Sequence, residues 1–280
     1  LDEDVTQLGA ALAALSGKPR LPLLVTLAWQ VRERDCRLAN QLISEAQSLL
    51  AHGGSAMPAG ADGTMVFAAC KARLDLTQGV LLTLQSDLDG AAQLIEQALT
   101  QFEQAGDLTG LGDAKYCLAS VWQDRGKPKQ RDEFLQLAIA DFIAAQDSTR
   151  ADFCRARLLH YAAFRDVIGT KAQLASQFDP ARHWPTLVNA WLESARAVVA
   201  IFSGDPASAI KHFLKAWAAA RATGQIRQAI IAASNASDSF ATLGDLNAAL
   251  EWDEQALELA RSNGLPSMMG SALIQTGNIL

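Results

Sequence analysis

Small apolar residues recur at helical spacing in the stretch before Gly264. Ala249, Ala256 and Ala260 lie 4, 11 and 15 residues after Asp245, which places them on one side of an α-helix, where a second helix can approach closely. Asp commonly caps a helix N-terminus, and Gly suits the left-handed conformation with which many helices end. The pattern therefore predicts a helix between Asp245 and Gly264.

The same template recurs along the chain. Good copies start at Asp35, Asp87 and Asp205, and each has Ala at the fourth and eleventh positions after the Asp. A weaker copy starts at Lys127, where Arg131 occupies the fourth position. Self-similarity at a fixed period is the signature of a repeat architecture.

Two hairpins depart from the regular step of 40 residues between successive copies. The first two copies are 52 residues apart, and the excess falls on the Gly- and Pro-rich segment 53–63, for which we expect a flexible loop. Between Lys127 and Asp205 there is room for one more hairpin. We expect its second helix to start at Gly169-Thr170 and to be interrupted at Pro180, because Pro cannot continue a helix interior.

Each template helix follows another amphipathic segment, so the unit is a pair of antiparallel helices whose apolar face the next pair covers. We predict an all-α fold, a right-handed α–α superhelix of about six hairpins forming a single domain over residues 1–280, with essentially no sheet. An opening helix near residues 4–15 would cap the array, and 266–280 would start a further helix. The predicted hairpins are 20–54, 64–106, 108–146, 148–180, 184–224 and 225–264.

These small positions resemble the tetratricopeptide repeat, whose helix pairs carry small residues at three positions. The step of 40 residues exceeds the family's period of about 34, and Gly stands where that repeat ends in Pro. The matching residues are Gly79, Ala119, Ala197 and Ser237 in first helices and Ala91, Ala209, Ala249, Ala98, Ala216 and Ala256 in second helices.

A narrower resemblance concerns residues 23–50. This segment is similar to the first hairpin of the helical-repeat regions that precede output domains in bacterial signalling proteins, above all diguanylate cyclases with a GGDEF domain. The resemblance implies a cytoplasmic, non-catalytic sensory module whose output domain would follow Leu280. No GGDEF motif is present in the chain.

Composition narrows the function classes. The net charge of −6 and the absence of a basic stripe argue against nucleic-acid binding. No apolar run is long enough for membrane insertion. The four cysteines lie far apart, which is typical of buried thiols in a reducing compartment rather than of a metal or redox site. The cysteines are Cys36, Cys70, Cys117 and Cys154.

No catalytic motif is found, and no metal or cofactor is expected. None of the four histidines has a second ligand at the spacing of a zinc helix, and there is no phosphate loop or nucleophile elbow. Gly106, Gly110 and Gly112 are assigned to a turn between helices. The acidic pairs Asp132-Glu133 and Asp253-Glu254 are assigned to solvent-exposed helix faces.

One polar group differs from this background. Arg157, Tyr161 and Arg165 are spaced four residues apart and share a helix face, with His160 beside them. This face could bind an anionic ligand or, in an enzyme, take part in catalysis. The alternative is a solvated basic face paired with neighbouring acids.

The family's pattern places the binding surface on the concave wall formed by the first helices. A Lys/Asn clamp for a terminal carboxylate is absent, and the mixed, fairly apolar wall suits a helix or an apolar peptide. Trp191 has the alternative of packing between hairpins, and Trp184 is expected at the surface. The wall positions are Asp113, Tyr116, Ser120 and Gln123 in the third hairpin, Trp191, Ser194, Val198 and Ile201 in the fifth, and Ile231, Ser234, Asp238 and Ala241 in the sixth.

The sequence thus predicts a regulatory module that binds a protein or peptide in its groove and controls an attached output domain. A stand-alone scaffold that assembles a complex through the same groove is the alternative. A homodimer through the exposed array ends is a further expectation.

Overall fold

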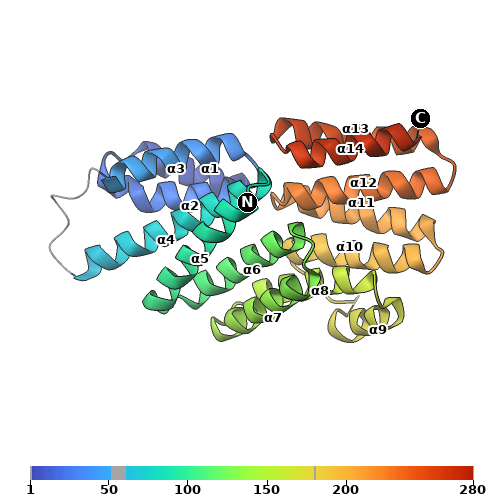
Figure 1. The fold of residues 1–280 in the computed structure, drawn as a ribbon, viewed down its shortest axis with the longest axis horizontal. Helices are drawn as coiled ribbons and strands as arrows, with labels where there is room; N and C mark the ends of the chain where they lie inside the picture. The colour runs from blue at the N-terminus through green and yellow to red at the C-terminus, as the bar shows by residue number, and fades with distance from the viewer. Residues whose placement is uncertain (1, 52–60, 180, 280) are drawn as a thin grey trace. The chain divides into compact units, whose positions relative to one another are not determined.

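The computed structural model describes residues 2–51, 61–179 and 181–279, and every regular element in these ranges is a helix (Figure 1). The predicted all-α fold is confirmed. The chain divides into two compact units, Leu1–Gln146 and Asp147–Leu280. The single domain and the handedness of the superhelix stay predictions.

Unit 1 contains three hairpins. Each first helix packs against the second helix that follows it, and α5 packs against α6. The expected loop 53–63 lies outside the described residues except for 61–63, which belong to α4. The elements are α1 (Asp2–Ala13), the short 3-10 helix η1 (Lys18–Arg20), the first helices α2 (Leu21–Val31), α4 (Ala61–Leu84) and α6 (Leu108–Asp124), and the second helices α3 (Cys36–Ala51), α5 (Leu88–Ala105) and α7 (Pro128–Ala144).

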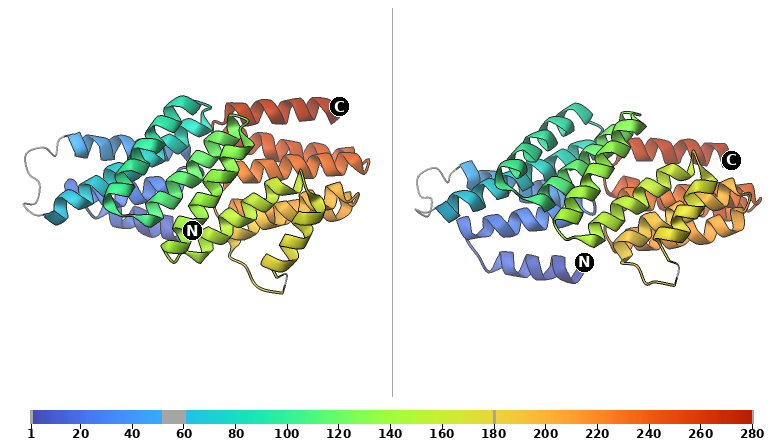
Figure 2. Two further views of the ribbon diagram at one scale, coloured as in Figure 1. Left: turned by 60° about the horizontal axis from the view of Figure 1, so that its bottom comes forward. Right: turned by 90° about the horizontal axis from the view of Figure 1, so that it is seen from below.

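Unit 2 contains three more hairpins and a last helix. Its helices from α10 to α14 lie side by side (Figures 1 and 2), each packed against the next along the chain. The first helices are α8 (Ser148–Ala163), α10 (Thr186–Phe202) and α12 (Ile226–Thr242). The second helices are α9 (Val167–Gln177), α11 (Pro206–Ala222) and α13 (Leu246–Ser262), and α14 (Pro266–Ile279) follows them.

The helix ends follow from local chemistry. At each good template start, the Asp carboxylate accepts a hydrogen bond from the backbone N–H three residues later, as Asp245 does from Ala248 at 3.1 Å. Gly106 and Gly264 adopt φ values of 67° and 65°, so both form the left-handed ends that the sequence predicted. The fourth hairpin differs, because Asp166 rather than Gly169-Thr170 starts its second helix and accepts from Gly169 N at 2.8 Å.

The small positions of the template are buried where helices pack against one another. Ala249, Ala256 and Ala260 are fully buried, as are the equivalent alanines of the other good copies. At Gly79 an added Cβ would lie 2.6 Å from the Ile95 side chain. Steric room therefore explains why these positions require Ala or Gly.

The weak template copy buries an arginine at one of the small positions. Arg131 is 5 % exposed although it stands where the other copies have Ala. Its guanidinium donates to Gln123 Oε1 on α6 at 2.5 Å and to Asp132 Oδ1 at 2.7 Å. The buried charge is thus held by a carboxylate and an amide, which the charge-burial penalty requires.

Two glycines assigned to a turn lie inside a helix instead. Gly110 and Gly112 belong to α6, and only Gly106 lies at the turn. A Cβ on Gly110 would lie 2.3 Å from the ring of Phe102, and one on Gly112 would lie 2.6 Å from the ring of Phe142. These glycines make room for the two buried phenylalanines.

Candidate functional site

In unit 2, the structure brings two predicted groups of residues together. His160 of α8 shares a 3.0 Å hydrogen bond between Nδ1 and Ser194 Oγ of α10. Its ring lies edge-on to Trp191 at 5.2 Å and to Tyr161 at 5.2 Å. The Arg157 guanidinium lies 5.0 Å from the Trp191 ring. We call these five residues the His160 cluster.

The His160 cluster forms because the fourth hairpin is short. α9 has only 11 residues, so α10 packs extensively against α8 as well as against α11. Trp184 covers Phe178 at the end of α9, with ring centroids 4.8 Å apart, and its Nε1 donates to Asp179 O at 3.1 Å. The prediction that Trp184 lies at the surface is wrong, because only 6 % of it is exposed.

The His160 cluster is packed interior. Arg157 and His160 are each 4 % exposed, and Trp191 is 5 % exposed. Arg165 follows the end of α8 at Ala163 and is exposed, so the helix face inferred from four-residue spacing does not extend to it. The geometry favours a role in holding α8 to α10 over an open anion site.

A second buried charge group supports the same packing. Glu193 of α10, 8 % exposed, accepts hydrogen bonds from Arg196 at 2.6 Å and from the His212 Nδ1 position at 2.7 Å. Burial alone would raise the pKa of Glu193, but the hydrogen bonds from His212 and Arg196 outweigh it and hold the pKa below its usual value. Helical spacing could not predict this partner of His212, because the carboxylate lies 19 residues away on another helix.

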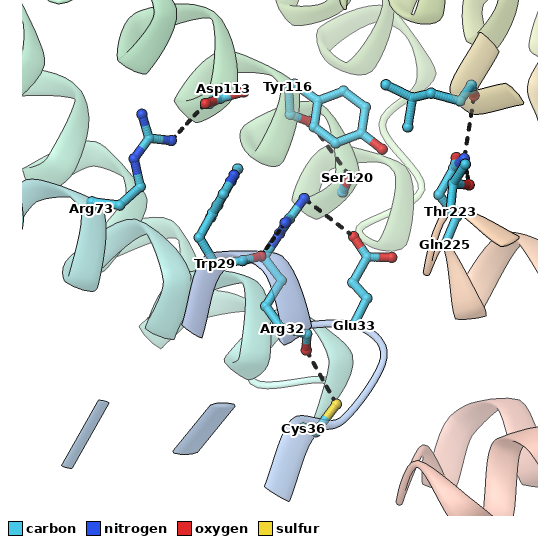
Figure 3. Close-up of polar contacts among 11 residues, drawn as sticks. Trp29, Arg32, Glu33, Cys36, Arg73, Asp113, Tyr116, Ser120, Thr223 and Gln225 are labelled. Carbon is cyan, nitrogen blue, oxygen red and sulfur yellow. Dashed lines mark hydrogen bonds and ion pairs between the residues drawn. The ribbon is translucent and has the colours of Figure 1, made fainter. Parts of the chain in front are cut away.

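In unit 1, side chains from three successive first helices meet (Figure 3). Arg73 of α4 donates to Asp113 Oδ2 of α6 at 2.6 Å, and its guanidinium lies 4.9 Å from the Trp29 ring of α2. The Arg32 guanidinium stacks on the same ring at 3.6 Å and lies 3.9 Å from Glu33 Oε1. We call Trp29, Arg32, Glu33, Arg73 and Asp113 the Trp29 cluster.

The predicted wall residues of α6 lie beside this cluster. Tyr116 and Ser120 are half-buried and, in Figure 3, stand across from Trp29 and Arg32. Ser120 Oγ donates to Tyr116 O at 3.4 Å. The side-chain oxygen of Gln123, the next wall residue, accepts a hydrogen bond from Arg131.

The thiol of Cys117 is enclosed by these charges. Burial raises its pKa to about 12, with Arg32 and Arg73 acting against Asp113 and Glu33. Burial likewise raises the pKa of Cys36 to about 11. All four cysteines are free thiols, and a raised pKa keeps a thiol protonated and unreactive. Within the described ranges, no three His, Cys, Asp or Glu side chains are placed to hold a metal ion.

The last pair of predicted wall residues lies next to α14. Gln275 of α14 donates to Ser234 O of α12 at 2.8 Å. Desolvation raises the pKa of Asp238, and a hydrogen bond with the same Gln275 opposes that rise. α14 therefore packs on the side of α12 that the sequence assigned to a ligand.

The sequence reasoning missed Trp29, Arg32 and Arg73. A signal was present for Arg73, because it lies 14 residues before Asp87, the same offset that selected Asp113 and Trp191. In the first hairpin, Trp29 falls between two of the template's wall positions, and Arg32 lies one residue beyond the last of them. Only the packing of α2 against α4 brings them to the same place.

None of the helices in the described part of the chain joins the length and the apolar character of a membrane span. No protein-family model matches the chain, and the search of curated proteins found no match. Among solved structures, the chain is similar to the apo form of the quorum sensor NprR from B. thuringiensis. The TM-score is 0.55 at 13 % sequence identity, with 96 % of this chain and 73 % of that chain covered. At this identity the similarity shows the fold, an all-α array of helical hairpins.

Proposed function

We propose that the chain is a regulatory module that binds a peptide or protein segment on the first helices of unit 1. The observation that carries the proposal is the Trp29 cluster with Tyr116 and Ser120 beside it (Figure 3). Trp, Tyr and Arg are the residues most enriched at interface hot spots. Trp29, Arg32 and Tyr116 are only half-buried, so each retains surface for a partner.

The chemistry of the cluster favours an extended or helical segment with both apolar and polar groups. The exposed part of Trp29 offers apolar contact, and Arg32, whose side chain is 20 % exposed, offers a guanidinium donor. A backbone carbonyl or carboxylate of a bound segment would satisfy that donor. The structural similarity to a quorum sensor supports a sensing role for this fold.

The finer proposal is that this module controls an output domain, such as a diguanylate cyclase, in a cytoplasmic bacterial signalling protein. Buried free thiols accord with a reducing compartment. The sequence of the gene beyond the codon for Leu280 tests the proposed output domain, since a stop codon there would contradict it. The second candidate function is a stand-alone scaffold that assembles a complex through the same surface. The expected homodimer is a separate proposal, which light scattering of the purified chain tests.

The binding surface is tested with peptides selected from a phage-displayed random library on the full chain. We expect the selected peptides to bind Arg32→Ala and Tyr116→Ala at least about tenfold more weakly than the wild type, as for hot-spot residues. Fluorescence anisotropy measures the affinities. Circular dichroism verifies that both variants are folded.

A matched control removes another stacked arginine. Arg182 lies 4.2 Å from the Trp184 ring, far along the chain from the wall of unit 1. Arg182→Ala should leave peptide affinity within about twofold. Peptides that bind all three variants equally well, or a library that yields no binder, would contradict the proposed surface.

A further inference from the structure

The last hairpin carries a carboxylic acid at a core position of the repeat. Asp253 lies eight residues after the N-cap Asp245. At the same offset the other copies have large apolar residues that are 0–3 % exposed, and Asp253 is 0 % exposed. Its assignment to a solvent-exposed face is therefore wrong, whereas Glu254 beside it is exposed. The equivalent residues are Ile43, Ile95, Leu135 and Phe213.

The two hydroxyl groups next to Asp253 already donate hydrogen bonds to backbone carbonyls. Ser237 of α12 and Thr276 of α14 adjoin the carboxyl group. The Ser237 hydroxyl already donates to Ala249 O at 2.8 Å, and the Thr276 hydroxyl donates to Ala272 O at 3.0 Å. Each hydroxyl has one proton, so to donate to Asp253 it would have to weaken the bond that it makes to the backbone. Neither oxygen of Asp253 accepts a hydrogen bond in this packing.

An ionised carboxylate is also an acceptor alone, whereas a carboxylic acid has one O–H to donate. The protonated form of Asp253 can therefore donate to Ser237 or Thr276 while both hydroxyls keep their bonds to the backbone. The charged group that acts on Asp253 from α12 is Asp238, which is negative, and α14 contributes the neutral Thr276. Among the described residues that influence Asp253, none supplies a positive charge.

We propose that Asp253 is a neutral carboxylic acid in this packing, and that its ionisation releases α14 from the α12–α13 hairpin. The protonated acid bridges α13 to α14 through Thr276. An ionised Asp253 would instead be a buried charge that is repelled by Asp238 and has no positively charged partner to offset its desolvation. This pH-dependent release of α14 does not depend on whether the first helices of unit 1 bind a peptide.

The sign of the pH dependence follows from burial. Desolvation raises the pKa of Asp253 above its usual value and Asp238 raises it further, while Ser237 and Thr276 act in the opposite direction. The folded state therefore holds this proton at pH values where the unfolded chain has lost it. The stability of α14 packing falls as pH rises from the ordinary carboxyl pKa through the raised one.

Hydrogen exchange of the full chain tests whether ionisation of Asp253 releases α14. We expect the wild-type segment 266–279 to lose about tenfold or more in protection, corrected for intrinsic exchange rates, between about pH 5 and about pH 8. Asp253→Asn should keep its protection across this range, because the amide is neutral and can donate to both hydroxyls. Asp253→Leu, which restores the apolar residue of the other copies, should do the same.

Glu254→Gln is the matched control, since it removes a neighbouring exposed charge and should keep the wild-type pH profile. The proposal would be overturned if segment 266–279 of the wild type were equally protected at both pH values. It would also be overturned if both Asp253 variants lost protection with rising pH as the wild type does. Protection restored at high pH by millimolar Mg²⁺ or Ca²⁺ in the wild type alone would also overturn it, because a cation rather than a proton would then neutralise Asp253.

Discussion

Phe102→Ala is expected to destabilise unit 1 by about 3–5 kcal/mol, the usual cost of removing a fully buried aromatic ring. Phe102 is 1 % exposed and ranks among the largest fully buried side chains. Its ring fills the space that Gly110 leaves on α6, and the Arg73 guanidinium lies 5.0 Å from it. Urea unfolding of the full chain, followed by circular dichroism, measures the loss.

Gly110 provides the complementary half of a double-mutant cycle. Gly110→Ala alone should cost about 1–3 kcal/mol, because its Cβ would lie 2.3 Å from the Phe102 ring and that ring has nowhere to move. In the Phe102→Ala background the same change should be neutral or stabilising by up to about 1 kcal/mol, the gain in helix propensity.

The control is Gly270→Ala in α14, where an added Cβ would meet nothing within 4 Å. This variant should be slightly more stable than the wild type. If Gly110→Ala behaved like Gly270→Ala in the wild-type background, the steric account of the α5–α6 contact would be wrong.

A comparison of the hairpins at one template position shows why the fold could be predicted from the sequence. At the fifteenth template position, Phe102 and Phe142 face glycines, whereas Ala220 and Ala260 occupy the same position in later hairpins. Small residues at fixed offsets and Asp caps are local signals, and they are repeated often enough to identify helices and their pairing. The helix after Asp166 escaped this reasoning because Thr170 and Gln177 stand where the good copies have Ala.

The candidate site was less predictable because its contacts are not local. Arg73 and Asp113 are 40 residues apart in sequence, and His212 and Glu193 are 19 apart. A template offset can place a residue on a wall, as it did for Tyr116 and Ser120. It cannot show whether that wall is filled, as it is at Trp191, because the filling depends on the length of the neighbouring helix α9.

Arg73→Met is expected to destabilise unit 1 by about 2–4 kcal/mol, somewhat less than a fully buried charge pair because the arginine is partly solvated. The Asp113 side chain is 7 % exposed and that of Arg73 is 18 % exposed. The change removes the 2.6 Å partner of a buried carboxylate and the stacking on Trp29. Urea unfolding again gives the free energy.

Three further variants separate charge from packing. Arg73→Lys keeps the charge but loses the planar stacking on the Trp29 and Phe102 rings, so its cost should be intermediate. The double variant Arg73→Met/Asp113→Leu removes both charges and should recover most of the loss. The exposed pair of Arg261 and Glu258, 3.8 Å apart, is the matched control, and Arg261→Met should cost less than about 0.5 kcal/mol.

The double variant also separates stability from binding. Because it restores most of the stability while removing the guanidinium that joins α2, α4 and α6, it should regain most of the wild-type unfolding free energy without regaining full affinity for the selected peptides. If it bound them as the wild type does, Arg73 would only support the fold, and the binding surface would be confined to Trp29, Arg32 and Tyr116. If Arg73→Met cost no more than Arg261→Met, Arg73 would not be what joins the first helices.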